Sequence, residues 1–285
     1  MALESFYPEN IKHITLKDHD CIYVDMGYGT PVIFLQGFAT NITIFDGNYP
    51  DFSATRRVIA FDYPGYYLSE KKANTPYNLG YMADAVCELI EKLSVENVVL
   101  VGSSMGGAIA IETAKRCPDR LSAMVLIAPS GFSGRAPVKA RIMGVQEKLV
   151  PAEFFRKKFF DTLLLRADTF FVDKEHPKKD AFIAQYYLMK DRDDFDLWIG
   201  TLTRMARATL SADNRTGLED ITIPTYIMWG DSDEALPVEG SYIAHDAFED
   251  NATLEVIPNA GHIFFVEQPA LFFEKVDGYL KSKGL

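Results

Sequence analysis

Three features are scarce in this sequence of 285 residues, and each scarcity excludes a class of protein. No stretch approaches the roughly 18 uninterrupted apolar residues that a transmembrane helix needs, so no membrane span is expected. Basic residues are also few, with 29 Lys and Arg against 40 Asp and Glu. The resulting formal net charge of −11 would repel phosphate backbones, so no nucleic-acid partner is expected.

Cysteine is the third scarce residue, with only Cys21, Cys87 and Cys117 in the chain. Their odd number, wide spacing and lack of a C-x-x-C pair favour a reducing compartment over a disulfide framework. We expect all three to be small packing residues. The N-terminus shows no basic stretch followed by an apolar run, so we expect no secretory signal and a cytoplasmic location. No cluster of His, Cys and carboxylates has metal-ligand spacing, so we expect no metal site.

Short apolar runs rich in β-branched residues are plentiful and alternate with helical segments. The runs are 31–35, 57–61, 97–101, 123–128 and 225–229, with a further strand expected at 254–257. They are apolar throughout rather than alternating, which is typical of parallel strands covered on both faces. Residues 81–93 and 108–117 have helical spacing, and a closing helix is expected at 270–280. The repeated βαβ pattern predicts an α/β fold with a mostly parallel wound sheet and helices on both faces.

Two regions depart from this pattern. Residues 11–26 alternate around a polar turn, which predicts an antiparallel hairpin at the sheet edge. Residues 133–217 contain few strand-like runs and many aromatic and basic residues at helical periods, so we interpret them as a helical insertion. The predicted organisation is a core domain of 1–132 and 218–285 with a helical cap of 133–217.

The motif Gly102-Ser-Ser-Met-Gly106 lies directly between a predicted strand and a predicted helix. A nucleophile on so sharp a turn occupies strained backbone, where a Cβ on either flanking residue would collide with the strand or the helix. The glycines remove those atoms, and the helix N-terminus directs N–H groups toward a developing oxyanion. We therefore predict Ser104 as a nucleophile.

A serine hydroxyl needs a base to take its proton, and His262 lies in the loop between the last strand and the last helix. A histidine there can overhang the carboxyl edge of the sheet. The acid that orients it should follow the strand 225–229, where Asp231 and Asp233 both occur. We predict Asp233, with Asp231 as the alternative.

The order Ser104, Asp233, His262, together with the strand pattern, resembles the serine hydrolase branch of the α/β-hydrolase fold family. That resemblance implies a helical cap, no cofactor, and two main-chain oxyanion donors, which fall by position on Phe38 and Met105. The family usually has His-Gly-x before the first donor, whereas this chain has Gln36 in place of the histidine.

A second family landmark, Asp-x-Pro-Gly-x-Gly-x-Ser, appears at residues 62–69 with Tyr67 in place of the second glycine. We interpret this segment as a structural loop.

The resemblance implies a small-molecule substrate, and the aromatic cap favours an apolar one. Candidate substrate contacts are Gln36, Ser103, Tyr186 and Ile263. The predicted function is carboxylesterase-like hydrolysis through an acyl-enzyme. One alternative is hydrolysis of carbon-carbon bonds in aromatic ring-cleavage products, although such enzymes usually have Trp where this chain has Ile263. An acyltransferase, or a receptor that uses the pocket only for binding, also stays open.

Overall fold

The computed structural model describes residues 2–132, 142 and 152–285. Its centre is an eight-stranded sheet in the order β1-β2-β4-β3-β5-β6-β7-β8. The strands are β1 (Lys12–Leu16), β2 (His19–Met26), β3 (Pro31–Leu35), β4 (Arg57–Phe61), β5 (Val98–Ser103), β6 (Leu121–Ile127), β7 (Thr225–Gly230) and β8 (Ala252–Ile257). All the predicted strands are present, which confirms the α/β fold.

The pairing explains the two kinds of strand pattern in the sequence. The strands from β4 through β3 to β8 pair in parallel, whereas β1 pairs with β2 and β2 with β4 in antiparallel fashion. Every residue of β5 and of β7 is buried, as expected of strands covered on both faces. The N-terminal hairpin, by contrast, forms the sheet edge and exposes part of β1.

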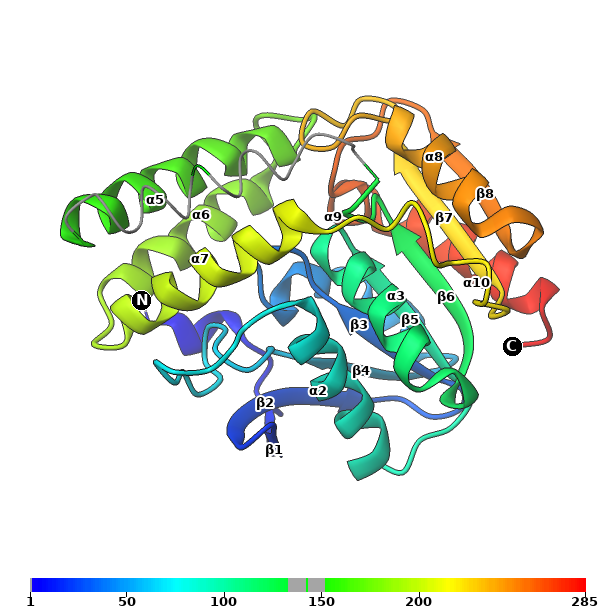
Figure 1. The fold of residues 1–285 in the computed structure, drawn as a ribbon, viewed down its shortest axis with the longest axis horizontal. Helices are drawn as coiled ribbons and strands as arrows, with labels where there is room; N and C mark the ends of the chain where they lie inside the picture. Colours follow the sequence, from blue (N-terminus) through cyan, green and yellow to red (C-terminus); the bar gives the residue numbers. More distant parts are fainter. Residues whose placement is uncertain (1, 133–141, 143–151) are drawn as a thin grey trace.

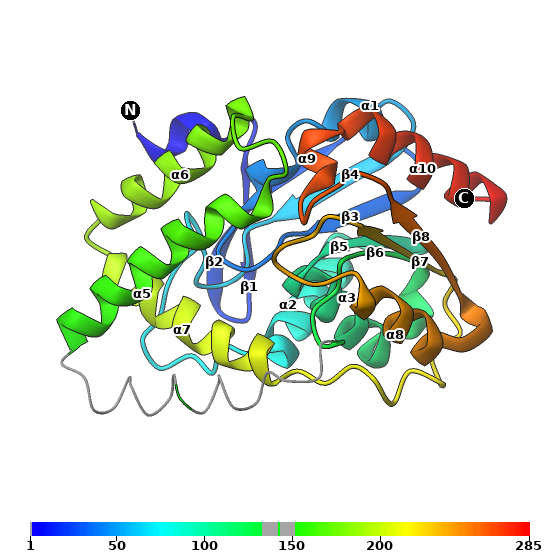
Figure 2. The ribbon, with the colours of Figure 1, turned by 90° about the horizontal axis from the view of Figure 1, so that it is seen from above.

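Helices cover both faces of the sheet (Figure 2). Helices α1 (Tyr49–Ser53) and α10 (Pro269–Ser282) lie on one face, and α2 (Leu79–Lys92), α3 (Met105–Arg116) and α8 (Glu239–Phe248) lie on the other. The short helix α9 (Phe264–Glu267) directly follows the loop that carries His262. The helices predicted near 81–93, 108–117 and 270–280 are therefore confirmed as α2, α3 and α10.

The insertion between β6 and β7 is mostly helical in the part that the structure describes. Helices α5 (Ala152–Ala167), α6 (Pro177–Lys190) and α7 (Phe195–Ser211) gather at one end of the molecule (Figure 1). Aromatic side chains join them, with ring centroids 5.7 Å apart for Phe160 and Phe195 and 6.2 Å apart for Tyr186 and Trp198. Most of the first 19 residues of the predicted cap, 133–151, lie outside the described residues.

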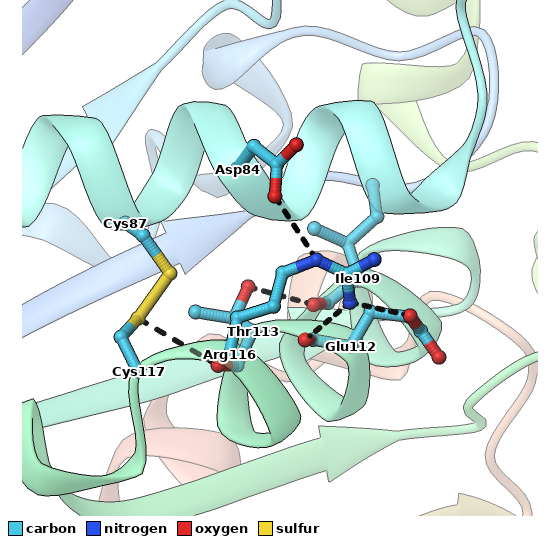
Figure 3. Close-up of a disulfide and its surroundings, with 7 residues drawn as sticks. All are labelled: Asp84, Cys87, Ile109, Glu112, Thr113, Arg116 and Cys117. Atoms are coloured by element: carbon cyan, nitrogen blue, oxygen red, sulfur yellow. Dashed lines mark hydrogen bonds and ion pairs between the residues drawn. A yellow bond between two sulfur atoms is a disulfide. The ribbon is translucent and has the colours of Figure 1, made fainter.

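The prediction that the cysteines are unpaired is wrong for two of them. Cys87 of α2 and Cys117 at the end of α3 form a disulfide (Figure 3). The helices pack against each other on one face of the sheet, which brings the two Cα atoms within 6.3 Å, inside the range a disulfide spans. Residue spacing could not reveal this pairing, and the cysteines no longer support the inference of a reducing compartment.

The third cysteine, Cys21, is buried in β2, and burial raises the pKa of its thiol to about 12. Within the described ranges, no helix combines the length and apolar character that crossing a membrane requires.

Candidate active site

Ser104 occupies the single residue between β5 and α3 and has φ 55° and ψ −114°. A positive φ is unusual for a side chain other than glycine and stores strain that the surrounding structure must hold. The flanking glycines make this turn possible. A Cβ on Gly106 would lie 2.0 Å from the carbonyl oxygen of Leu35, and one on Gly102 would lie 2.5 Å from the carbonyl oxygen of Gly106. No side chain fits at either position, so strand and helix can pass this closely only because both residues are glycine.

His262 and Asp233 are buried together beyond the carboxyl ends of β8 and β7. The imidazole Nδ1 lies 2.7 Å from Oδ2 of Asp233, and because a carboxylate only accepts, Nδ1 carries the donated proton. The other carboxylate oxygen, Oδ1, accepts from the main-chain N–H groups of Ala235 and Leu236, both at 2.8 Å. These bonds fix the carboxylate, and the carboxylate fixes the tautomer in which the imidazole Nε2 can accept a proton.

The alternative acid, Asp231, has a different environment. It is exposed, and its Oδ1 accepts a hydrogen bond from the hydroxyl of Ser232 at 2.8 Å. The geometry therefore favours Asp233 over Asp231 as the partner of the histidine.

Ser104 and His262 line the same cavity of about 120 Å³, which is walled by both the core and the cap. The ring of Phe170, from the cap, lies with its centroid 5.4 Å from that of His262 and covers one side of the imidazole. Ser130, after β6, brings its Oγ to 3.5 Å from Oγ of Ser104. Sequence reasoning did not single out Ser130 as a site residue, although it lies in the Ala128-Pro-Ser-Gly segment.

Both expected oxyanion donors belong to segments that meet at Ser104. Met105 is the first residue of α3, so its N–H has no acceptor within the helix. Phe38 follows β3 and lines the cavity with Ser104. The loop approaches the nucleophile closely, since a Cβ on Gly37 would lie 3.6 Å from Cβ of Ser104. This arrangement is compatible with two donors converging on one oxygen.

Tyrosines from the 62–69 segment brace the loop that carries Phe38. The hydroxyl of Tyr67 donates to the carbonyl oxygen of Ala39 at 2.6 Å, and that of Tyr63 donates to the carbonyl oxygen of Gln36 at 3.3 Å. Ala39 itself has a positive φ of 57°. Tyr67, which departs from the family's glycine, thus supports the loop in which Gln36 departs from the family's histidine.

The first residue of that segment, Asp62, anchors it in the interior. Its carboxylate accepts from the hydroxyl of Tyr7 at 2.6 Å and from the N–H of Ile42 at 3.0 Å, and the hydroxyl of Ser69 donates to its carbonyl oxygen. Burial raises the pKa of Asp62 to about 7. These contacts agree with a structural role for the segment.

The four candidate substrate contacts fall into two groups. Ser103 and Ile263 line a small cavity together with Ser104 and His262. Gln36 and Tyr186 are instead buried in the packed interior, where Tyr186 contacts Phe182 and Trp198. Across the residues that the structure describes, no group of three His, Cys or carboxylate residues could hold a metal ion.

Comparison with known proteins identifies relatives of this arrangement. A family model described as alpha/beta hydrolase fold matches residues 30–269. The AB hydrolase superfamily protein YisY of Bacillus subtilis is 30% identical over 268 residues, which cover 90% of this chain and 94% of the relative. A 2-hydroxymuconate semialdehyde hydrolase of a Pseudomonas species is 26% identical, with 90% and 88% covered. The solved structure of the esterase EaEST from Exiguobacterium antarcticum matches with a TM-score of 0.77 and 28% identity, covering 95% of this chain and 99% of the esterase.

Proposed function

This chain belongs to the alpha/beta hydrolase fold family, and from that premise we propose that it is a serine hydrolase that cleaves esters of apolar small molecules. One observation carries the proposal: His262, held by a buried hydrogen bond to Asp233, lines the same cavity as a serine at a strained turn. A turn of this kind costs free energy and persists where it serves a function. The similarity to an esterase supports the same reaction class.

In the proposed mechanism, Oγ of Ser104 attacks the ester carbonyl carbon while Nε2 of His262 takes the hydroxyl proton. Asp233 stabilises the imidazolium that forms, without itself being protonated. The negative charge on the carbonyl oxygen is met by the N–H groups of Phe38 and Met105. The C–O bond to the alcohol then breaks, and His262 gives its proton to the leaving oxygen.

The second half of the reaction repeats these steps with water. Water gives a proton to His262 and attacks the acyl-enzyme, and the acid product leaves as Oγ of Ser104 regains its proton. Every proton transfer uses one imidazole, so the chemistry needs no cofactor.

The test is hydrolysis of p-nitrophenyl esters by the purified protein and by a Ser104→Ala variant. We expect the variant to lose at least ~10³-fold in kcat, since only binding and the oxyanion donors would remain. Ser122→Ala is a matched control that removes a hydroxyl away from the cavities at Ser104. A fluorophosphonate probe should label the wild type and the control but not Ser104→Ala. Unchanged turnover in Ser104→Ala would exclude the proposed nucleophile.

The orienting acid is tested by Asp233→Asn beside Asp231→Asn. The amide cannot hold the imidazole in the required tautomer, so we expect Asp233→Asn to lower kcat by about 10⁴-fold. The exposed Asp231→Asn should stay within about twofold of wild type. The reverse ranking would assign the role to Asp231.

A second candidate function is cleavage of a carbon-carbon bond in aromatic ring-cleavage products. The similarity to a 2-hydroxymuconate semialdehyde hydrolase favours it, whereas Ile263 departs from the Trp usual in such enzymes. Loss of the visible absorbance of a ring-cleavage product, with a higher kcat/KM than any ester, would select this reaction. A folded protein that neither hydrolyses these substrates nor reacts with the probe would instead be a receptor or binding protein.

A further inference from the structure

The cavity at Ser104 continues beneath the cap. A second cavity of about 370 Å³ shares four of its lining residues with the first, namely Phe38, Arg166, Ala206 and Leu210. The shared residues come from the oxyanion loop and from helices α5 and α7, which lie next to each other in the cap (Figure 2). The two cavities therefore adjoin, and together, as the pocket of this proposal, they extend from the nucleophile along α5.

The charge of this pocket is opposite to that of the whole chain. The charged side chains that line the two cavities are Arg166 and Lys158, and neither cavity is lined by an Asp or Glu among the described residues. The chain carries a formal net charge of −11. Residues 158, 162 and 166 all line the pocket and are spaced four apart, so one face of α5 presents both cations to the cavity.

Arg166 also differs from the basic residues around it. Arg156 on the same helix is paired with Asp196 at 3.1 Å, and Lys179 is paired with Asp168. Within the part of the chain that the structure describes, the guanidinium of Arg166 has no carboxylate partner. Arg166 lines both cavities while it is also exposed to solvent, and its planar fork matches a carboxylate in a bidentate geometry.

Thr209 adds a polar side chain to the lining of the first cavity. Oγ1 of Thr209, on α7, is buried and makes no hydrogen bond to any described residue, and Thr209 lines the cavity with Arg166 and Ser104. Phe155, Phe159 and Leu163 line the second cavity and suit an apolar spacer.

We propose that this pocket binds an ester that carries a second, anionic group, a carboxylate, which Arg166 receives while an apolar spacer lies along α5. This proposal rests on the proposed esterase function and names its substrate class. The reacting carbonyl lies at Ser104, and the carboxylate lies toward the shared end of the two cavities.

The experiment compares two p-nitrophenyl esters of equal acyl length, one ending in a carboxylate and one ending in a methyl group. The measured quantity is the ratio of kcat/KM for the carboxylated ester to kcat/KM for the neutral ester. We expect Arg166→Gln to lower this ratio about two- to fivefold, mostly through KM, because an ion pair at a solvent-exposed guanidinium is lost. A parallel pair of esters with the carboxylate in the alcohol part shows which side of the scissile bond it occupies.

Lys157→Gln is the matched control, since it removes the same charge from an exposed neighbour on α5 that is absent from the lining of both cavities. Its ratio should equal that of wild type. If Arg166→Gln also has the same ratio as the wild type, for both pairs of esters, the proposal is overturned.

If no ester is hydrolysed, the esterase function fails, and the anion site is tested separately by calorimetric titration with hexanedioate. Weaker binding to Arg166→Gln than to Lys157→Gln would support the anion site. Equal binding, or no binding to the wild type, would overturn it.

Discussion

Removing the Cys87–Cys117 disulfide should destabilise the protein by an amount that follows from chain topology. The bond joins residues 30 apart, so it closes a loop of about that length in the unfolded chain. The loop-closure relation gives about 12 cal/mol/K of lost unfolded-state entropy, or about 4 kcal/mol at 25 °C. For a chain of 285 residues, the unfolding entropy per residue converts this into a fall in Tm of about 6 °C.

The assay is calorimetric melting of the oxidised protein with and without reductant, beside a Cys87→Ala/Cys117→Ala double variant. Both cysteines are only partly buried, so truncation to alanine adds little packing loss. The double variant should melt near the reduced wild type and should not respond to reductant.

Thiol titration in denaturant provides an independent check. Before reduction the wild type should react with one equivalent of reagent, from Cys21, and after reduction with three. Three reactive thiols in the unreduced protein, or a Tm that reductant does not change, would refute the bond and the reasoning built on it.

Three further predictions concern the site and its supports. Tyr67→Phe should lower the free energy of unfolding by about 1 kcal/mol, because a buried carbonyl of the oxyanion loop loses its hydrogen-bond donor. The same variant should lower kcat by a larger factor than it changes KM, and chemical unfolding and ester kinetics measure the two effects. Gly106→Ala should destabilise the fold by several kcal/mol, because the added methyl group would lie 2.0 Å from a backbone oxygen. Gly278→Ala, at an open position within α10, should instead stabilise the fold by about 0.5–1 kcal/mol, and thermal melts of the two variants test both predictions. The pKa of Asp62 is about 7 in the native state and 3.8 in the unfolded chain, so its contribution to the free energy of unfolding falls as pH rises between those values. Asp62→Asn should abolish that part of the pH dependence of the free energy of unfolding, measured from pH 4 to 8. The same pH dependence in the wild type and the variant would contradict this prediction.

The secondary structure could be predicted from the sequence because its causes are local. The apolar runs of the central strands and the helical periodicities of α2, α3 and α10 depend on residues within a few positions of one another. Helix α8 was not predicted, although it is as amphipathic as α3 and α10, because its buried face consists mainly of the small residues Gly240, Ser241 and Ala244.

The position of Ser104 was also a local matter, because both of its glycine neighbours lie within the same turn. The choice between Asp231 and Asp233, by contrast, did not depend on local sequence. Two carboxylates two residues apart look alike in sequence, and only the packing of the loop after β7 against the His262 loop places one of them at 2.7 Å.

The sequence by itself determined the strand pattern, the sharp turn at Ser104 and the family that these features resemble, since each is written in short-range spacing. Only the tertiary structure decided the Cys87–Cys117 bond, the tyrosine support of the oxyanion loop and the cationic pocket along α5. Each of these joins residues whose separation in the chain says nothing about their distance. That distance depends on how helices and loops pack over the sheet, which is a property of the whole fold.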